Sequence, residues 1–186
     1  CDVDAIQAIA NRYDLKVIYD AAHAFGTTVQ GKSIFDFGDI STCSFHATKL
    51  FHTVEGGMVT TTSPELLRRM SLMRNFGHSG PDTFDGVGIN GKNSEFHAAM
   101  GIVNLRHFDS VAGKRRSQCE AYLNLLSNSQ LLLPDARNSA WNCAYFPVLF
   151  ENESLCLKVK RALEKAEILP RRYFYPSLDG VNNWGL

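Results

Sequence analysis

Short apolar segments that alternate with helical patterns constrain the fold of this chain more than any other feature. Strand-forming side chains are concentrated in four short stretches: residues 15–19, 40–45, 57–61 and 144–150. Apolar residues at helical spacing occupy four others: residues 2–12, 66–75, 94–126 and 153–167. Because short strands alternate with helices along the chain, we predict an α/β fold.

The middle of the chain contains the features that we use to divide it. Residues 77–93 hold five glycines and almost no periodicity, so we predict a long loop of the kind that is usually functional or forms an interface. We expect the following helix to be interrupted near Gly113. A domain boundary at 110–115 would separate a sheet domain from a smaller C-terminal domain.

Charge and cysteine content exclude several classes of protein. Nineteen Lys and Arg residues balance nineteen Asp and Glu residues, which argues against a nucleic-acid binder or a surface held to acidic lipid. Apolar runs all fall short of the ~20 residues that cross a bilayer, so we expect no membrane association. Five cysteines without a CxxC motif favour reduced thiols in a cytoplasmic protein.

Asp20 and His23 form the first candidate site, directly after the apolar segment 15–19. Open α/β sheets bind ligands beyond the carboxyl ends of their strands. We expect an acid at such a strand end to be partly desolvated and to need a cationic or donor partner. The alternative is an aspartate that only caps the next turn, and the residues alone leave both open.

Lys49 and Ser44 form the second candidate, after the predicted strand 40–45 and before Gly56 and Gly57. Burial or a cationic neighbour lowers the pKa of a lysine and makes it a Schiff-base nucleophile, and hydroxyl groups beside it can hold an anion. A solvated surface lysine is the alternative. The glycine pair indicates a close approach of the backbone or a positive φ.

Asn90 lies in the third candidate, the segment 88–95 that leads into a helix. Loop amides and a helix N-terminus can bind an anion, and Ser94 as a helix cap is compatible with that interpretation. Other chemistries lack their motifs: the histidines have no ligand set at zinc spacing, so we predict no metal. A nucleophile elbow, a P-loop and a dinucleotide fingerprint are also absent from the sequence.

Taken together and in order, these segments resemble the DegT/DnrJ/EryC1/StrS family of pyridoxal phosphate (PLP) sugar aminotransferases. The resemblance rests on Asp-Ala-Ala-His-Ala-Phe-Gly at 20–26, Gly-Asp-Ile at 38–40, Ser-Phe-His-Ala-Thr-Lys at 44–49, Glu-Gly-Gly at 55–57, Gly-Ile-Asn-Gly-Lys-Asn-Ser-Glu at 88–95 and Arg-Arg-Tyr-Phe-Tyr-Pro at 171–176. It implies the fold-type I architecture, a mostly parallel sheet flanked by helices plus a small C-terminal α+β domain. Residues 1–112 would be the C-terminal part of the large PLP-binding domain, and residues 113–186 part of the small domain.

The resemblance also implies roles for individual residues. Lys49 would hold PLP as a Schiff base and move the proton during catalysis, and Asp20 would pair with the pyridine nitrogen. His23 would contact the ring or its 3′ oxygen, and Ser44 the phosphate. Asn90 would reach the cofactor phosphate of the other subunit, which implies a homodimer. Lys92 stands where many relatives have Arg, and its role stays open.

The activity implied is transfer of an amino group from glutamate to a nucleotide-linked keto-deoxysugar. The Ser-Phe-His-Ala-Thr-Lys motif is more similar to that of enzymes acting on 4-keto sugars. A dTDP-4-keto-6-deoxyhexose is therefore our first choice of substrate. Supply of amino sugar to a bacterial surface polysaccharide is the purpose that we expect.

Family members are substantially longer at the N-terminus, and the C-terminal tail of this chain is also short. We therefore expect a truncated chain, which leaves a non-catalytic remnant kept for dimerisation or binding as an alternative. A PLP-dependent sugar dehydratase is the other alternative, and Lys49 argues against it because those relatives carry His there.

Overall fold

The computed structural model describes residues 1–134 and 139–178. The chain divides into two compact units. The first contains Cys1–Ser127 and Pro134–Phe146, and the second contains Asn128–Leu133 and Pro147–Leu186. Our predicted boundary near residue 112 falls inside one continuous helix, and the assignment of the two domains stays a prediction.

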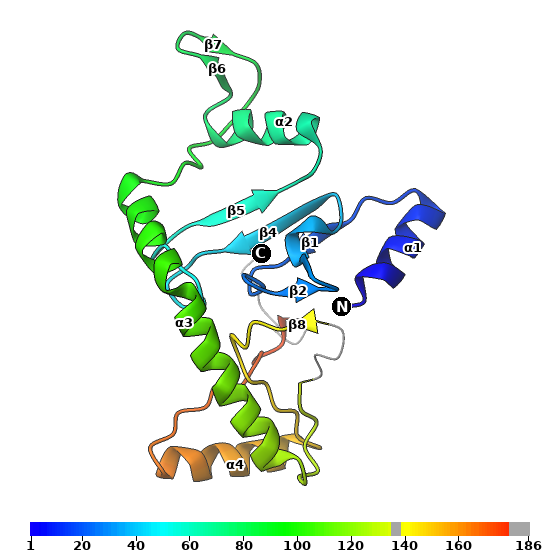
Figure 1. Cartoon of the computed structure of the whole chain (residues 1–186), viewed down its shortest axis with the longest axis vertical. Helices are drawn as coiled ribbons and strands as arrows, with labels where there is room; N and C mark the ends of the chain where they lie inside the picture. The colour runs from blue at the N-terminus through cyan, green and yellow to red at the C-terminus, as the bar shows by residue number, and fades with distance from the viewer. Residues whose placement is uncertain (135–138, 179–186) are drawn as a thin grey trace. The chain divides into compact units, whose positions relative to one another are not determined.

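A three-stranded sheet lies in the first unit, with strand order β1-β4-β5 (Figure 1). These strands span Ile18–Asp20, Ile40–Ser44 and Gly57–Thr60. β1 and β4 are parallel, with Asp20 opposite Thr42, whereas β5 is antiparallel to β4. The parallel pair places the ends of β1 and β4 at one edge of the sheet, the position where open sheets bind ligands. The apolar segment 15–19 is typical of a buried parallel strand, but β1 lies at the edge of this sheet and its Ile18 is 65% exposed.

Side-chain caps begin all four α-helices, which explains why the sequence located them well. The helices are α1 (Val3–Tyr13), α2 (Pro64–Arg74), α3 (Glu95–Leu126) and α4 (Glu153–Lys165), capped by Asp2, Ser63, Ser94 and Asn152. Each cap accepts a hydrogen bond from a backbone N–H of the first turn, which would otherwise lack a partner. The expected break near Gly113 is wrong: α3 continues through it, since one glycine weakens a helix by only ~1 kcal/mol.

Two short hairpins lie in the first unit. β2 (Thr28–Val29) and β3 (Lys32–Ser33) pair across Gln30 and Gly31, both at positive φ, and β8 (Ser139–Ala140) adds to β2; a 3₁₀ turn (Ile34–Asp36) follows β3. The segment 77–93 is not wholly a loop, because β6 (His78–Gly80) and β7 (Thr83–Phe84) form a hairpin within it.

The strand predicted at 144–150 is also wrong. The structure has only an isolated bridge there, between Leu132 and Leu149. Apolar and aromatic side chains make this segment look like a strand, but they pack individually in an irregular segment rather than along a ladder.

Four phenylalanine rings pack against one another in the first unit. Phe25 stacks on Phe51 with centroids 4.2 Å apart, and Phe108 of α3 meets Phe25 edge-on at 5.0 Å. Phe45 lies edge-on to Phe51 at 5.0 Å. Gly26, at φ +79°, makes room for this packing, because a Cβ there would lie 2.5 Å from Phe108. We call Phe25, Phe45, Phe51 and Phe108 the aromatic cluster.

All five cysteines are free thiols. Burial raises the pKa of Cys43 and of Cys119 to about 11, which keeps both thiols protonated at neutral pH. Within residues 1–134 and 139–178, no helix has the length and apolar character needed to cross a bilayer.

We predict that Phe108→Ala lowers the free energy of unfolding by about 2–4 kcal/mol, because it removes one ring from the aromatic cluster. The matched control is Phe96→Ala on the same helix, whose side chain is 90% exposed and whose loss should change stability by less than about 0.5 kcal/mol. Urea unfolding followed by circular dichroism measures both. Equal losses for the two variants would contradict the role of the cluster.

Candidate active site

The chain makes a tight turn after β1, and this turn carries Asp20 and His23. Ala21 N–H donates to Thr42 O at 2.9 Å, and Ala24 N–H donates to Ala21 O at 2.9 Å. The carboxylate of Asp20 accepts from Ala22 N–H at 3.1 Å. Asp20 is exposed, so its predicted desolvation is wrong, and the turn cap that the sequence left open is the contact it makes.

The loop after β4 closes on itself and holds Lys49 near its middle. Phe45 N–H donates to Gly56 O at 2.8 Å, and Thr53 N–H donates back to Phe45 O at 2.9 Å. Lys49 N–H donates to His46 O at 2.9 Å, which forms a turn at the lysine. Gly57 is required by close approach, since a Cβ there would lie 2.8 Å from the carbonyl oxygen of Cys43.

These two segments bring Lys49 and His23 together. Lys49 Nζ lies 2.6 Å from His23 Nε2, across 26 residues of sequence. Burial and the positive charge of Lys49 both lower the pKa of His23, while Asp20 opposes them. A neutral imidazole beside an amine is an arrangement that can accept or pass on a proton.

A narrow hollow surrounds this pair. Its lining comes from three segments of the first unit, 22–25, 44–51 and 142–145, and includes His23, Ser44 and Lys49. Asp20 lies on the same turn as His23 and acts on it through its charge, without lining the hollow itself. The structure therefore gathers four of the five predicted site residues at one edge of the sheet.

Asn90 lies apart from that group. It forms an antiparallel bridge with Asn75, and its side-chain oxygen accepts from Lys92 Nζ at 2.7 Å. The same ammonium of Lys92 stands 4.1 Å from the centre of the Phe76 ring, a cation–π contact. Lys92 therefore holds Asn90 in its loop and also packs on Phe76.

Two residues at the hollow were missed by the sequence analysis. Asn142 is buried and donates to the carbonyl oxygens of His23 and Phe25, each at 2.8 Å. Tyr145 places its ring 4.9 Å from the His23 ring. The available signal was an asparagine inside the apolar run Ala-Trp-Asn-Cys-Ala-Tyr, because a polar residue buried among aromatic ones needs hydrogen-bond partners.

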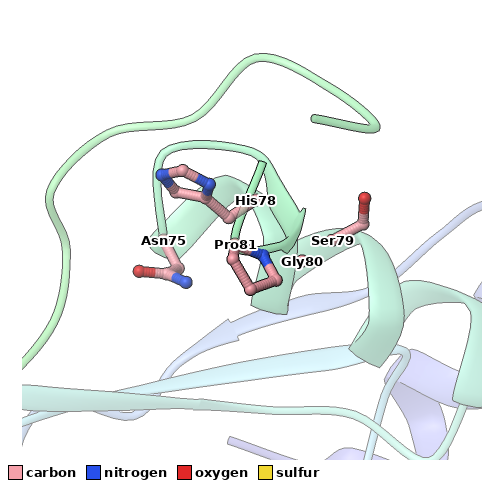
Figure 2. A pocket seen from close by; sticks show the side chains of 5 residues that line it. All are labelled: Asn75, His78, Ser79, Gly80 and Pro81. Atoms are coloured by element: carbon pink, nitrogen blue, oxygen red, sulfur yellow. The ribbon is translucent and has the colours of Figure 1, made fainter. Parts of the chain in front are cut away.

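A second hollow lies at the β6–β7 hairpin (Figure 2). Asn75, His78, Ser79, Gly80 and Pro81 line it, and Figure 2 shows Ser79 directed away from His78 and Asn75. His78 is the one ionisable side chain in this lining, and its ring packs 4.3 Å from that of Phe84. Because Ser79 is directed away from His78, this lining does not pair a hydroxyl nucleophile with an imidazole base.

A lysine amine, an imidazole, a hydroxyl and a carboxylate lie beyond the ends of the parallel strands of this α/β unit, and a lysine amine is the group that forms a Schiff base with a carbonyl cofactor. The DegT/DnrJ/EryC1/StrS aminotransferase family matches residues 1–182, and the chain belongs to this family.

Named relatives agree with that assignment. The dTDP-4-amino-4,6-dideoxy-D-glucose transaminase of Shigella dysenteriae is 38% identical over 181 residues, which cover 95% of this chain and 49% of the relative. The transaminase of the same name from Escherichia coli is 35% identical over 97% of this chain and 50% of its own length. The chain thus spans about half the length of the curated relatives it matches.

Solved structures agree as well. DesI, crystallised with its TDP-sugar product, shares 33% identity and a TM-score of 0.83 over 95% of this chain and 46% of its own. A sugar aminotransferase of Streptococcus pneumoniae in its PLP form has a TM-score of 0.85 at 20% identity, over 95% of this chain and 52% of its own, which shows the fold alone. The predicted family and α/β class are confirmed, and the family is one of PLP-dependent aminotransferases.

The charges beside His23 predict opposite shifts of its pKa in two variants. Lys49→Gln removes a positive charge and should raise the pKa of His23, whereas Asp20→Asn removes a negative charge and should lower it. NMR titration of the His23 ring measures both shifts. Lys32→Gln, at an exposed lysine of β3, is the control and should leave the titration unchanged. Shifts in the same direction for the two site variants would contradict the geometry.

Proposed function

We propose that this chain forms the lysine-bearing part of a PLP-dependent transaminase that aminates a nucleotide-linked keto-deoxysugar with glutamate as donor. The observation that carries the proposal is the approach of Lys49 Nζ to His23 Nε2 at 2.6 Å, in a hollow at the edge where β1 and β4 end. Ser44 in the same lining and Asp20 on the adjoining turn supply the hydroxyl and the carboxylate that the cofactor needs.

The side chains fit PLP by their chemistry. The amine of Lys49 would hold the aldehyde covalently, and the hydroxyl of Ser44 would face a phosphate oxygen. One carboxylate oxygen of Asp20 accepts from the turn, and the carboxylate would pair with a protonated pyridine nitrogen. When bound, the cofactor supplies an aromatic ring that delocalises the electron pair left by a broken C–H bond.

The protein residues then provide the proton transfers. Lys49 Nζ would take the proton from the reacting carbon and return it. A general base must lie within hydrogen-bond reach of the proton that it abstracts. His23, whose pKa is lowered by burial and by Lys49, stays neutral near pH 7 and accepts a hydrogen bond from that amine. A neutral partner leaves the lysine proton mobile, whereas a carboxylate partner would hold it as an ion pair.

The substrate class is proposed from the relatives. Two of them are named as dTDP-4-amino-4,6-dideoxy-D-glucose transaminases, which supports a dTDP-4-keto-6-deoxyhexose as substrate. Synthesis of amino sugar for a bacterial surface polysaccharide by a cytoplasmic enzyme is the corresponding role. Other relatives are named for GDP-linked and 3-amino sugars. A test of substrate specificity therefore has to include GDP-linked and 3-keto sugars.

We also propose that the chain acts as a homodimer in which Asn90 reaches the phosphate of the partner's cofactor. Two observations support this: Asn90 lies outside the hollow that contains Lys49, and it is exposed on a loop. The contact from Lys92 orients the side-chain oxygen of Asn90, and the amide nitrogen is the group that would donate to a phosphate oxygen.

Covalent trapping tests the cofactor site. We predict that PLP followed by borohydride labels Lys49 at least tenfold faster than the other seven lysines, as measured by peptide mass spectrometry. Lys16→Gln, at an exposed lysine of the same unit, is the control and should leave labelling of Lys49 unchanged. Uniform labelling of all lysines would contradict the proposal and favour a non-catalytic remnant.

Product analysis tests the reaction. With PLP, glutamate and dTDP-4-keto-6-deoxyglucose, we predict equal amounts of 2-oxoglutarate and amino sugar, and loss of both in Lys49→Ala by a factor of ~10³ or more. The GDP-linked and 3-keto sugars serve as competing substrates in the same assay. A deoxygenated sugar without 2-oxoglutarate would identify a dehydratase and contradict transamination.

A further inference from the structure

The side chain of Asn142 makes several hydrogen bonds next to the proposed site. Its side-chain amide donates to the carbonyl oxygens of His23 and Phe25, both at 2.8 Å, across 119 and 117 residues of sequence. Its side-chain oxygen accepts from Ala144 N–H at 3.1 Å. The residue is only 7% exposed, so water cannot replace these bonds when they are lost.

The two bonded carbonyl groups belong to the turn that presents His23. A side-chain amide carries two N–H donors and can therefore bridge two backbone carbonyl oxygens. Because one of these carbonyls is that of His23 itself, the bridge fixes the backbone from which the imidazole extends toward Lys49.

The same segment also contacts the imidazole ring. The ring of Tyr145, three residues after Asn142, lies 4.9 Å from that of His23 with the planes tilted by 34°. Lys49 Nζ approaches the Nε2 atom of the imidazole at 2.6 Å. The backbone and the ring of His23 are thus both held from the segment 142–145, which is distant in sequence.

We propose that Asn142 is a positioning residue that acts through His23, holding its imidazole against the amine of Lys49. It contacts the backbone of His23 and Phe25, and its effect on Lys49 passes through His23. The consequence for transamination rests on the proposed function, whereas the positioning itself belongs to the chain without cofactor.

Asn104 provides a matched control for any loss of stability. It is also an asparagine whose amide donates to a backbone carbonyl, that of His52, at 2.8 Å. It reaches from α3 to the loop after β4 and makes no hydrogen bond with the turn that carries His23. A loss of stability from removing a partly buried amide should therefore appear in both the Asn104 and the Asn142 variant. An effect on His23 should appear only in the Asn142 variant.

The experiment compares Asn142→Ala with Asn104→Ala by NMR titration of His23 and by PLP–borohydride labelling of Lys49. We expect Asn142→Ala to shift the His23 midpoint upward, toward the ordinary value, and to slow labelling of Lys49 at least threefold relative to Lys16. Asn104→Ala should change neither. Unchanged His23 titration in Asn142→Ala, or equal changes in both variants, would overturn the proposal.

A measurement on the unmodified chain keeps the test decisive if Asn142→Ala does not fold. The side-chain amide protons of Asn142 should exchange with solvent at least a hundredfold more slowly than those of exposed asparagines, and exchange at the exposed rate would overturn the proposal. The His23 titration needs no cofactor. Failure of PLP labelling with the expected titration shift would therefore count against the proposed function alone.

Discussion

The aromatic cluster is the interaction on which the rest of the first unit depends. Phe25 comes from the turn after β1, Phe45 and Phe51 from the loop after β4, and Phe108 from α3. Burying one aromatic side chain contributes on the order of 1.5–3 kcal/mol, so four rings in mutual contact are enough to fix two loops that have little regular structure. Their packing sets the distance between the turn that carries His23 and the loop that carries Lys49.

Hydrogen bonds then position the backbone more closely than the packing of the aromatic rings can. Asn142 holds the carbonyl oxygens of His23 and Phe25 on the turn through two hydrogen bonds from its side-chain amide. Apolar contacts are non-directional, whereas a hydrogen bond fixes direction and distance together. The pairing of an amine with an imidazole at 2.6 Å therefore depends on both kinds of contact.

The local features of this chain were predictable from sequence, because each is determined within a few residues. The ends of β1 and β4 follow from short apolar runs, and the helix starts follow from caps such as Ser63 and Ser94. The features that were not predictable depend on contacts distant in sequence. Asn142 reaches across more than a hundred residues, and no local pattern shows which carbonyl it will meet. The exposure of Asp20 likewise depends on what packs beside the sheet edge, which its own strand does not encode.

The proposed chemistry follows from one arrangement, in which the turn after β1 and the loop after β4 would form a single PLP site around Lys49. A crystal structure of the borohydride-reduced complex with PLP tests this claim most directly. We predict continuous electron density from the cofactor to Lys49 Nζ, with Asp20 within hydrogen-bond distance of the pyridine nitrogen and Ser44 facing the phosphate. Density attached to a different lysine, or a cofactor ring outside the hollow lined by His23, would contradict it.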